Sequence, residues 1–295
     1  LIFSTGPLTG SPIPSSGKMV VATKSPLTQG YTDGNIGTKF AVELRKAGYD
    51  ALIVKGRARR PSVLYIEDGK ARLDDAEDLW GLDSYSMEDR LIERYGKDVG
   101  VVGIGPAGEN LVRFSTIVSQ KGRSGGRAGL GAVMGSKMLK AVVAIGGEEF
   151  AWPREVEELG RTMTDMANSN DNHDFWMRQG TMMTVEWCQN NGTLPTYNFR
   201  EGVFDGWEAI SGTAMEKEFK VAQKGCPNCN MICGMINEIK AGPMAGKRTE
   251  LDYENAAMLG SNLGIDDMNW VLTLNLYADE QGIDTISLGL SLIHI

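Results

Sequence analysis

The sequence contains little histidine, no excess of basic residues and no long hydrophobic run. The two histidines in 295 residues, His173 and His294, lie far from the clustered cysteines, so a zinc site completed by a neighbouring histidine is not indicated. The formal net charge is −8 and no basic stripe occurs, which argues against nucleic-acid binding. No apolar run reaches the ~18 residues that a membrane span needs. Residues 1–4 lack the character of a signal peptide.

Cysteine is also scarce, and its distribution does not suggest a framework of disulfide bonds. The chain contains four cysteines, three of which cluster within one short stretch. Clustered cysteines without paired spacing favour a reducing compartment, so we predict a cytoplasmic protein. Hydrophobic residues make up 42% and charged residues 23%, as in ordinary globular proteins. The length fits two domains or one large one.

The cysteine cluster has the spacing C-x2-C-x3-C, formed by Cys226, Cys229 and Cys233. Thiolates are soft ligands that select zinc, copper or iron–sulfur clusters, and a loop this short can direct three of them at one centre. Structural zinc normally has four nearby ligands, whereas iron–sulfur clusters are often completed by a distant cysteine. The spacing favours a 4Fe–4S cluster and leaves zinc, or thiols that bind no metal, as alternatives. We interpret Cys188 as a small buried hydrophobic residue rather than the missing ligand.

The first half of the chain is rich in glycine and short apolar runs, which favours strands and turns. Short helices are expected near 38–47 and 86–95, and a hairpin turn at 67–70. A further strand is expected at 111–114. Residues 37–56 and 126–147 each read as glycine, helix and strand, which is either a weak internal repeat or a chance similarity between common units. The clearest strands are predicted at 19–24, 51–55, 62–66 and 140–145.

Two glycine-rich stretches suggest ligand binding with different strength. Residues 103–108 match G-x-G-x-x-G, but no convincing helix follows, so we do not favour dinucleotide binding. Residues 122–131 combine several glycines with Arg123 and Arg127. Exposed backbone N–H groups beside arginines suit a phosphate or another polar anion. We therefore predict an anion or cofactor loop there, with a flexible surface loop as the alternative.

Helical periodicity dominates the second half. Helices are predicted over 153–166, 182–189 and 268–280, with a polar loop at 170–175 that contains a solvated His173. On a helix, Glu250 and Glu254 would share a face, which is usually a solvated acidic face. Beside a buried cofactor, one of the two carboxylates could instead accept a proton. Acidic residues at 279–284 oppose the dipole of the helix that ends there, which hints at binding of an amidine-like edge. A surface turn is the alternative for that stretch.

Several of these stretches, taken in order, resemble the tungsten-containing aldehyde:ferredoxin oxidoreductase family. The resemblance covers almost the whole chain, and the stretches are jointly specific. They are residues 46–51 (KAGYDA), residues 123–137 (RSGGRAGLGAVMGSK), the C-x2-C-x3-C loop, residues 258–264 (MLGSNLG) and residues 279–284 (DEQGID).

The resemblance implies tungsten, or molybdenum, held between two pyranopterins beside a 4Fe–4S cluster. Aldehydes would be oxidised to carboxylic acids, and the electrons would leave through the cluster to ferredoxin. Carried over by position, Cys226, Cys229 and Cys233 would bind the cluster, with a fourth cysteine beyond this chain. Glu254 would lie near the metal and transfer a proton. A family histidine near the metal would also lie outside the chain.

The resemblance also assigns residues to the two pterins. Lys18 stands where many members carry an arginine between pterin and cluster. Lysine keeps the positive charge of that arginine but cannot form its bidentate hydrogen bonds. Ile283 replaces the leucine usual in the family. One pterin, with a magnesium ion that bridges the pterin phosphates, would be held by Asn35, Gly37, Arg127 and Ala128. The other would be held by Asp279, Gly282 and Asp284.

We therefore predict an α+β fold, with a β-rich platform that contains a two-fold-like repeat and is followed by a mainly helical domain. The expected domains are 1–149, which binds pterin, and 150–295, which carries the cysteine loop. Both ends read as cut, so we interpret the chain as a fragment that could be inactive by itself, and whether 290–295 are native is left open. An aryl-CoA reductase subunit and a non-catalytic zinc-binding module are the alternatives. The substrate, the choice of tungsten or molybdenum and a homo-oligomeric state are left open.

Overall fold

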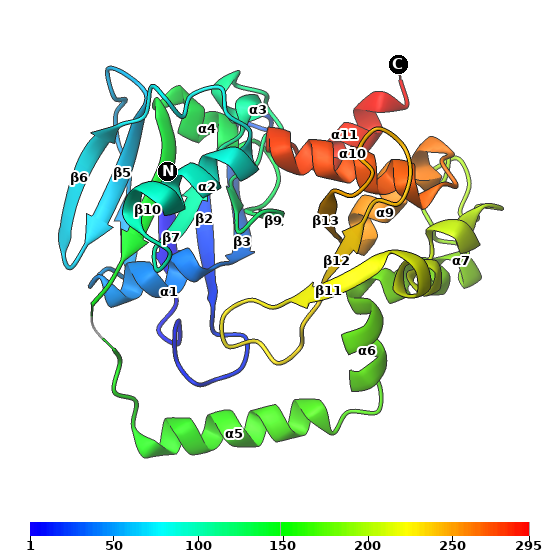
Figure 1. Ribbon diagram of the computed structural model, residues 1–295, viewed down its shortest axis with the longest axis horizontal. Coiled ribbons are helices and arrows are strands. Elements are labelled where there is room, and N and C mark those ends of the chain that lie inside the picture. Colours follow the sequence, from blue (N-terminus) through cyan, green and yellow to red (C-terminus); the bar gives the residue numbers. More distant parts are fainter. Residues whose placement is uncertain (148, 295) are drawn as a thin grey trace. The chain divides into compact units, whose positions relative to one another are not determined.

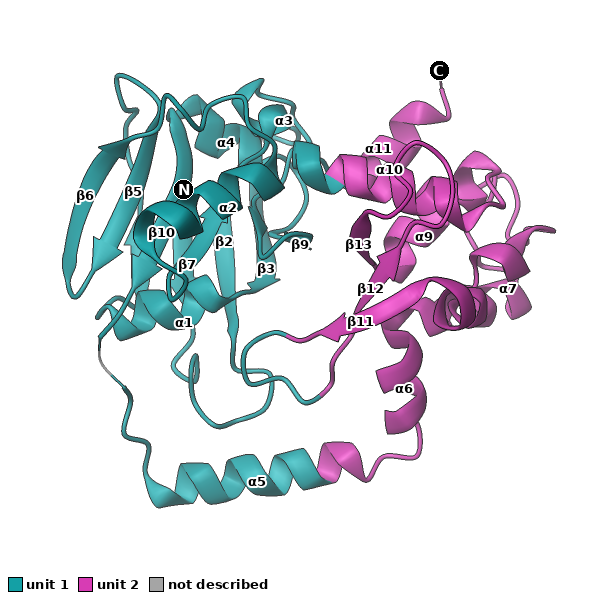
Figure 2. Ribbon diagram, viewed as in Figure 1, with its two compact units in different colours: residues 1–165, 226–230, 279–284 teal, residues 166–225, 231–278, 285–295 magenta. Residues whose placement is uncertain are grey.

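A computed structural model describes residues 1–147 and 149–294 of the chain. These residues form two compact units (Figure 2). Unit 1 is Leu1–Asp165 together with two short segments from later in the chain, Cys226–Asn230 and Asp279–Asp284. Unit 2 consists of Met166–Gly225, Met231–Ala278 and Thr285–Ile295, of which Ile295 is not described.

The boundary between the units differs from the predicted domain boundary at 149/150. Most of helix α5 (Arg154–Asn168) belongs to unit 1. It packs there because Gly160 has no side chain: a Cβ atom at Gly160 would lie 2.6 Å from the carbonyl oxygen of Pro12. The predicted domain limits thus stay a prediction, since compact units need not coincide with domains.

Unit 1 contains all the strands of the first half of the chain (Figure 1). Its strands are β1 (Ile2–Thr5), β2 (Lys18–Lys24), β3 (Tyr31–Gly37), β4 (Ala51–Ile53), β5 (Ser62–Glu67), β6 (Lys70–Asp75), β7 (Gly100–Gly103), β8 (Val118–Ser119), β9 (Arg123–Ser124) and β10 (Leu139–Ile145). Its helices besides α5 are α1 (Lys39–Lys46), α2 (Ser84–Tyr95), α3 (Pro106–Glu109) and α4 (Leu130–Ser136).

These strands form two sheets. The four-stranded sheet has the order β3-β2-β1-β4, and all of its pairs are antiparallel. The six-stranded sheet has the order β6-β5-β10-β7-β8-β9, in which β5 and β10 run parallel and the other pairs antiparallel. Strand β3 is therefore an edge of one sheet and β9 an edge of the other.

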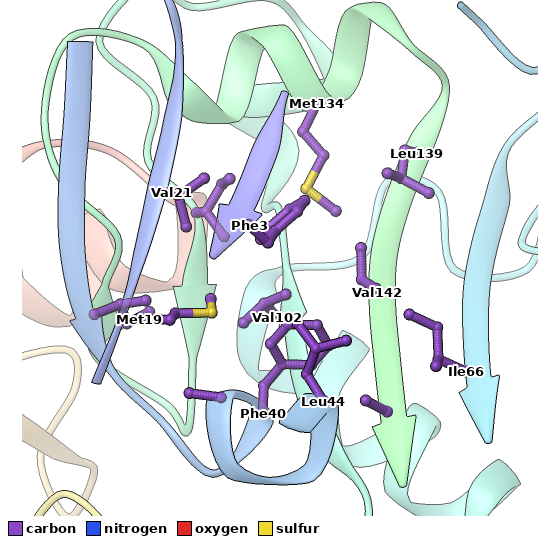
Figure 3. Packing of buried hydrophobic residues seen from close by; sticks show 14 of the residues in the cluster. Phe3, Met19, Val21, Phe40, Leu44, Ile66, Val102, Met134, Leu139 and Val142 are labelled. Carbon is purple, nitrogen blue, oxygen red and sulfur yellow. The ribbon is translucent and has the colours of Figure 1, made fainter. Parts of the chain in front are cut away.

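The main core of unit 1 gathers apolar side chains from both sheets and from two helices (Figure 3). Phe40 and Leu44 of α1 are fully buried in it, as is Phe3 of β1. Thr38 begins α1, because its hydroxyl accepts a hydrogen bond from the backbone N–H of Phe40. Burial of large apolar side chains is the main favourable term in folding, so this core fixes the edges on which the site is built.

Unit 2 is mainly helical but also contains a three-stranded antiparallel sheet that we did not predict, with the order β11-β12-β13. Its strands are β11 (Lys220–Lys224), β12 (Gly234–Glu238) and β13 (Arg248–Leu251). Its helices are α6 (His173–Gln179), α7 (Thr184–Asn190), α8 (Gly212–Ala214), α9 (Tyr253–Leu259), α10 (Met268–Gln281, whose last residues belong to unit 1) and α11 (Thr285–Leu292), with short 3-10 or π turns at η1 (Gly180–Met183), η2 (Trp207–Ile210), η3 (Met215–Phe219) and η4 (Ser261–Leu263).

The predicted α+β class is confirmed, as are the strands near 19–24, 51–55, 62–66 and 140–145. The stretches 37–56 and 126–147 each contain a helix followed by a strand, α1-β4 and α4-β10, and the repeat itself stays a prediction. The strand at 111–114 is wrong, since these residues form a turn. None of the helices formed by the described residues is long and apolar enough to cross a membrane.

Candidate functional site

The candidate site of unit 1 lies where the two sheet edges approach each other. A Cβ atom at Gly34 of β3 would lie 2.5 Å from the Cα atom of Gly126 and 2.7 Å from the carbonyl oxygen of Gly125, which follow β9. No side chain fits in that space, so glycine at position 34 allows the backbone of the arginine-containing loop to lie against β3. Part of the predicted anion loop thus packs against β3 at Gly34.

The first part of the cysteine loop packs on the end of the same strand. A Cβ atom at Gly37, the last residue of β3, would overlap the sulfur of Cys226 and lie 3.0 Å from the Cβ atom of Cys226. Lys18 of β2 is the register partner of Gly37. Only glycine leaves room for the sulfur at this position, so Gly37 allows Cys226 to pack against the end of β3.

Backbone and side-chain hydrogen bonds fix the rest of this segment. The N–H of Ser15 donates to the carbonyl of Asn228 (2.8 Å), and Nδ2 of Asn228 donates to the carbonyl of Ser11 (2.8 Å). Within the loop, the N–H of Cys229 donates to the carbonyl of Cys226 (3.1 Å), and Asn228 adopts a positive φ of 54°. The Ser15 hydroxyl lies 3.4 Å from the sulfur of Cys229. Cys226 and Cys229 are therefore held on one turn.

Arg123 of β9 contacts the first cysteine directly. Its Nη1 donates a hydrogen bond to the sulfur of Cys226 at 3.2 Å, across 103 positions of sequence. Both residues are partly buried. A guanidinium beside a sulfur favours the negatively charged form of that sulfur. The loop that we predicted to bind an anion thus also supplies a cation to the cysteine segment.

The acidic turn at the end of α10 packs on the segment that connects β7 to β8. The N–H of Thr116 donates to the carbonyl of Gly282 (2.8 Å), and the N–H of Asp284 donates to the carbonyl of Phe114 (3.0 Å). A Cβ atom at Gly105 would lie 2.5 Å from the carbonyl carbon of Gln281. The G-x-G-x-x-G stretch thus supports this turn, and its helix α3 (Pro106–Glu109) is only one turn long.

Arg127 joins the arginine-containing loop to the acidic turn. Its Nε lies 2.9 Å from Oδ2 of Asp284, whose side chain is 5% exposed, whereas that of Arg127 is 55% exposed. The neighbouring Ala128 has a positive φ of 68°, and its carbonyl accepts a hydrogen bond from the hydroxyl of Ser25 (2.8 Å). One loop therefore contacts the cysteine segment through Arg123 and the acidic turn through Arg127.

Most residues that the sequence assigned to the site belong to unit 1. Asn35, Lys18 and Arg127 are exposed, whereas Gly37, Gly282, Asp279 and Asp284 are buried. The hydroxyl of Ser84 donates to the carbonyl of Asp279 at 2.7 Å. The unit 1 members of the predicted set are Lys18, Asn35, Gly37, Arg127, Ala128, Cys226, Cys229, Asp279, Gly282 and Asp284.

Cys233 and Glu254 belong to unit 2 and are described there. Glu254 lies in the first turn of α9 and is exposed. The expected shared helical face with Glu250 is wrong, because Glu250 is part of β13 and is buried. Cys188 is buried as expected, and the hydroxyl of Tyr253 lies 3.1 Å from its sulfur. Burial, followed by this hydrogen bond, raises the pKa of Tyr253.

His173 also differs from its prediction. It begins α6 instead of lying in a polar loop, and its side chain is 16% exposed rather than solvated. Its Nε2 has no hydrogen-bond partner among the described residues. Its Nδ1 lies 3.5 Å from the exposed carboxylate of Asp174, which is not a residue of the predicted site. We assign it no function.

The cysteine thiols are the donors that the sequence assigns to an iron–sulfur cluster. No three histidine, cysteine, aspartate or glutamate side chains within residues 1–147 and 149–294 are arranged to hold a metal ion. None of the four cysteines forms a disulfide bond. Three thiols at C-x2-C-x3-C spacing, with Cys226 seated over a glycine and beside a guanidinium, nevertheless have the chemistry that an iron–sulfur cluster requires. The residues therefore fit such a cluster.

Sequence reasoning missed the role of Arg123 at Cys226 and those of Gly34 and Gly105 as packing positions. The composition of the 122–131 loop indicated anion binding and gave no reason to pair one arginine with a cysteine. Glycine in a strand does signal a close approach of another backbone. That signal, present at Gly34 and Gly37 of β3, could have located the contact surface without naming its partner.

Comparisons with known proteins agree across both units. Residues 1–146 match the model of the aldehyde ferredoxin oxidoreductase N-terminal domain, and residues 158–293 match that of domains 2 and 3. Tungsten-containing aldehyde ferredoxin oxidoreductases from Pyrococcus abyssi and Pyrococcus horikoshii are each 40% identical over 98% of this chain and 48% of theirs. The chain thus spans about half the length of these curated relatives.

A solved structure gives the same result at the level of the fold. It is a chain of the active-site complex of benzoyl coenzyme A reductase bound to a dienoyl-CoA, with a TM-score of 0.84 and 25% sequence identity. The match covers 99% of this chain and 46% of that one. Together, the two matching family models and the 40% identical relatives show that this chain belongs to the aldehyde ferredoxin oxidoreductase family.

Proposed function

We propose that the protein is a tungsten- or molybdenum-dependent oxidoreductase that converts aldehydes to carboxylic acids. In that reaction an aldehyde and one water give the acid, two protons and two electrons. The electrons leave through a 4Fe–4S cluster to ferredoxin or a similar carrier. When bound, the pterin-held metal supplies the two-electron chemistry. We propose a cytoplasmic location, with no nucleic-acid or membrane partner.

One observation carries this proposal: a single loop contacts both the cysteine segment and the acidic turn. Arg123 donates to the sulfur of Cys226 (3.2 Å), and Arg127 pairs with Asp284 (2.9 Å). A pterin cofactor that lies beside an iron–sulfur cluster also needs polar donors and acceptors. This loop contacts residues of both kinds. The similarity to relatives named as tungsten-containing aldehyde ferredoxin oxidoreductases supports the same function.

The first pterin and its magnesium bridge are assigned to Asn35, Gly37, Arg127 and Ala128. The exposed guanidinium of Arg127 suits a phosphate, because it offers parallel N–H donors. Ala128 has a positive φ, and its carbonyl accepts a hydrogen bond from the Ser25 hydroxyl, which holds this part of the loop. Asn35 is exposed on β3 and offers an amide to the same region.

The second pterin is assigned to Asp279, Gly282 and Asp284. The carboxylates of both aspartates are nearly buried, and a buried carboxylate suits a pair of parallel N–H donors such as those of an amino-pyrimidinone. Gly282 has a positive φ of 71°, which turns the chain between them. Lys18, exposed on β2, is assigned a position between pterin and cluster as a cation.

The cluster is assigned to Cys226, Cys229 and Cys233, with a fourth ligand outside this chain. Glu254 is the proposed proton acceptor. It is exposed in the first turn of α9, so its side chain is accessible from the solvent. No other carboxylate of unit 2 is assigned this role.

Metal analysis of anaerobically purified protein tests the proposal. We expect tungsten or molybdenum, together with iron and the broad visible absorbance of an iron–sulfur cluster. Aldehydes should reduce ferredoxin in an anaerobic assay. Protein that is prepared with a full supply of cofactors yet contains neither tungsten nor molybdenum would contradict the function. One equivalent of zinc without visible absorbance would indicate instead the non-catalytic zinc-binding alternative.

A second candidate function is supported by the likeness to the benzoyl coenzyme A reductase chain, at a TM-score of 0.84. In that case the protein would be the metal-bearing subunit of an aryl-CoA reductase, and the electrons would flow to an aromatic thioester. Parallel assays with aldehydes and with aromatic acyl-CoA thioesters separate the two functions. Activity with the thioester and none with any aldehyde would favour the reductase.

A further inference from the structure

We infer that Arg123 is a positioning residue that raises the reduction potential of the iron–sulfur cluster, through the hydrogen bond from its guanidinium to the sulfur of Cys226. This inference deepens the proposed function and rests on it, because it requires that Cys226 be a ligand of the cluster. It concerns a residue to which the sequence assigned only anion binding.

The contact itself is direct and charged. Nη1 of Arg123 lies 3.2 Å from the sulfur of Cys226, and both side chains are partly buried. Reduction adds one negative charge to a cluster, and this charge is shared with the sulfurs of its ligands. Hydrogen bonds to those sulfurs, and nearby positive charge, stabilise the reduced form and raise the potential. A guanidinium combines both effects in one group.

The backbone around Arg123 is held by a tight hairpin. Arg123 pairs with Ser119 in the β8–β9 ladder, and the residues between them have positive φ angles: 51° at Gln120, 50° at Lys121 and 107° at Gly122. The carboxylate of Glu88, on α2, accepts the backbone N–H groups of Gln120 and Lys121, each at 3.0 Å. The hairpin is therefore tied to the buried face of α2, to which Glu88 belongs, and this contact supports Arg123.

The sulfur of Cys226 also packs against β3. Gly37 provides the surface on which it rests, since a Cβ atom there would overlap the sulfur. The next cation, Lys18, pairs in register with Gly37, but its side chain is exposed. Water screens an exposed ammonium more strongly than a partly buried guanidinium. Arg123 is therefore the cation from which the larger effect on the cluster is expected.

The test compares the reduction potential of the cluster in three variants, by redox titration followed with electron paramagnetic resonance. For Arg123→Gln we expect the equilibrium constant for reduction to fall about tenfold, which is about 59 mV for a one-electron couple. Arg123→Lys keeps the charge but loses the planar fork, so a smaller decrease is expected. Lys121→Gln is the matched control, because it removes a charge from the same hairpin, where the Lys121 ammonium pairs with Asp89 (2.8 Å).

The outcomes separate the inference from the function on which it depends. A decrease in Arg123→Gln that exceeds the change in Lys121→Gln supports the inference. Equal changes, or none, overturn it while the cluster and the proposed function stand. If Arg123→Gln fails to retain iron, the test relies on Arg123→Lys. A cluster potential in Arg123→Lys equal to that of wild type overturns the inference, and a lower potential supports it. Wild-type protein that assembles no cluster would contradict both, and metal analysis detects that case first.

Discussion

The guanidinium of Arg127 pairs with the carboxylate of Asp284, with 2.9 Å between Nε and Oδ2, although 157 positions of sequence separate the two residues. The side chain of Asp284 is 5% exposed. A carboxylate so far from water needs charged or hydrogen-bonding partners, and Arg127 is one of them. This pair joins the arginine-containing loop to the acidic turn.

Arg127→Gln should lower the free energy of unfolding by about 1–2 kcal/mol, because a buried carboxylate loses a charged partner. Urea unfolding followed by tryptophan fluorescence measures the change. Arg60→Gln is the control, since both members of the Arg60–Asp75 pair are exposed, at 66% and 43%. Such surface pairs contribute at most about 1 kcal/mol. Equal losses in both variants would show that burial of Asp284 does not matter.

Gly37→Ala should reduce the iron content of anaerobically purified protein several-fold. A methyl group at this position would overlap the sulfur of Cys226, so the cysteine segment has to move. The control is Gly30→Ala, where the nearest atom would be the Thr28 hydroxyl at 3.7 Å. Iron content equal to that of wild type in Gly37→Ala would mean that Cys226 can bind iron from another position.

Lys140→Met should destabilise unit 1 by about 3 kcal/mol, because it leaves the buried carboxylate of Glu109 without its charge partner. Lys140 and Glu109 form an ion pair in which the side chains are 0% and 4% exposed. The same Lys140 ammonium donates to the carbonyl of Leu82 at 2.8 Å. The stability loss is measured by thermal unfolding of Lys140→Met, Glu109→Gln and the double variant. Additive losses would show that the two residues are not coupled.

Tyr95 should ionise only at strongly alkaline pH. Burial, followed by the hydrogen bond to Asp74 (2.7 Å), raises the pKa of Tyr95 from 10.0 to about 12. The folded chain thus keeps a proton that the unfolded chain has lost. The contribution to stability is full below pH 10 and disappears as pH rises through about 12. Tyr95→Phe should remove one late-titrating phenol from the absorbance titration, and an unchanged titration would refute the assignment.

Glu254→Gln should lower aldehyde turnover at least tenfold and leave tungsten and iron contents unchanged. Removal of a proton acceptor typically costs about 10²–10⁴-fold in rate. Glu186→Gln is the matched control, because Glu186 is also an exposed glutamate in the first turn of a unit 2 helix, α7. Full activity of Glu254→Gln would remove this residue from the proposed mechanism.

The sequence predicted the elements of unit 1 well because their signals are local. The strand at 62–66 is apolar, and the turn at 67–70 contains the Asp-Gly pair that suits a hairpin, as the register of β5 and β6 confirms. Thr38 likewise marks the start of α1. The sheet of unit 2 was missed because β11 (KVAQK) is short, charged and largely exposed, without apolar alternation.

The contacts of the site could not come from spacing alone. Arg123 and Cys226 are 103 positions apart, and no local pattern links them. The resemblance to a family grouped the arginine loop, the cysteines and the acidic turn, but it gave no atom-level partners. Glu250 was placed on a helix because acidic residues at every second position fit either a helix end or a strand. In the structure, Glu250 pairs with Ile236 of β12, so it lies in a strand.

The assignment of residues 226–230 and 279–284 to unit 1 has a consequence for synthesis on the ribosome. Residues 1–165 emerge long before Cys226 or Asp284. Unit 1 therefore cannot be completed until most of unit 2 has also been synthesised. Contacts between such distant positions form slowly, because a long loop has to close first. The arginine-containing loop therefore gains its partners at Cys226 and Asp284 only after most of unit 2 has been synthesised.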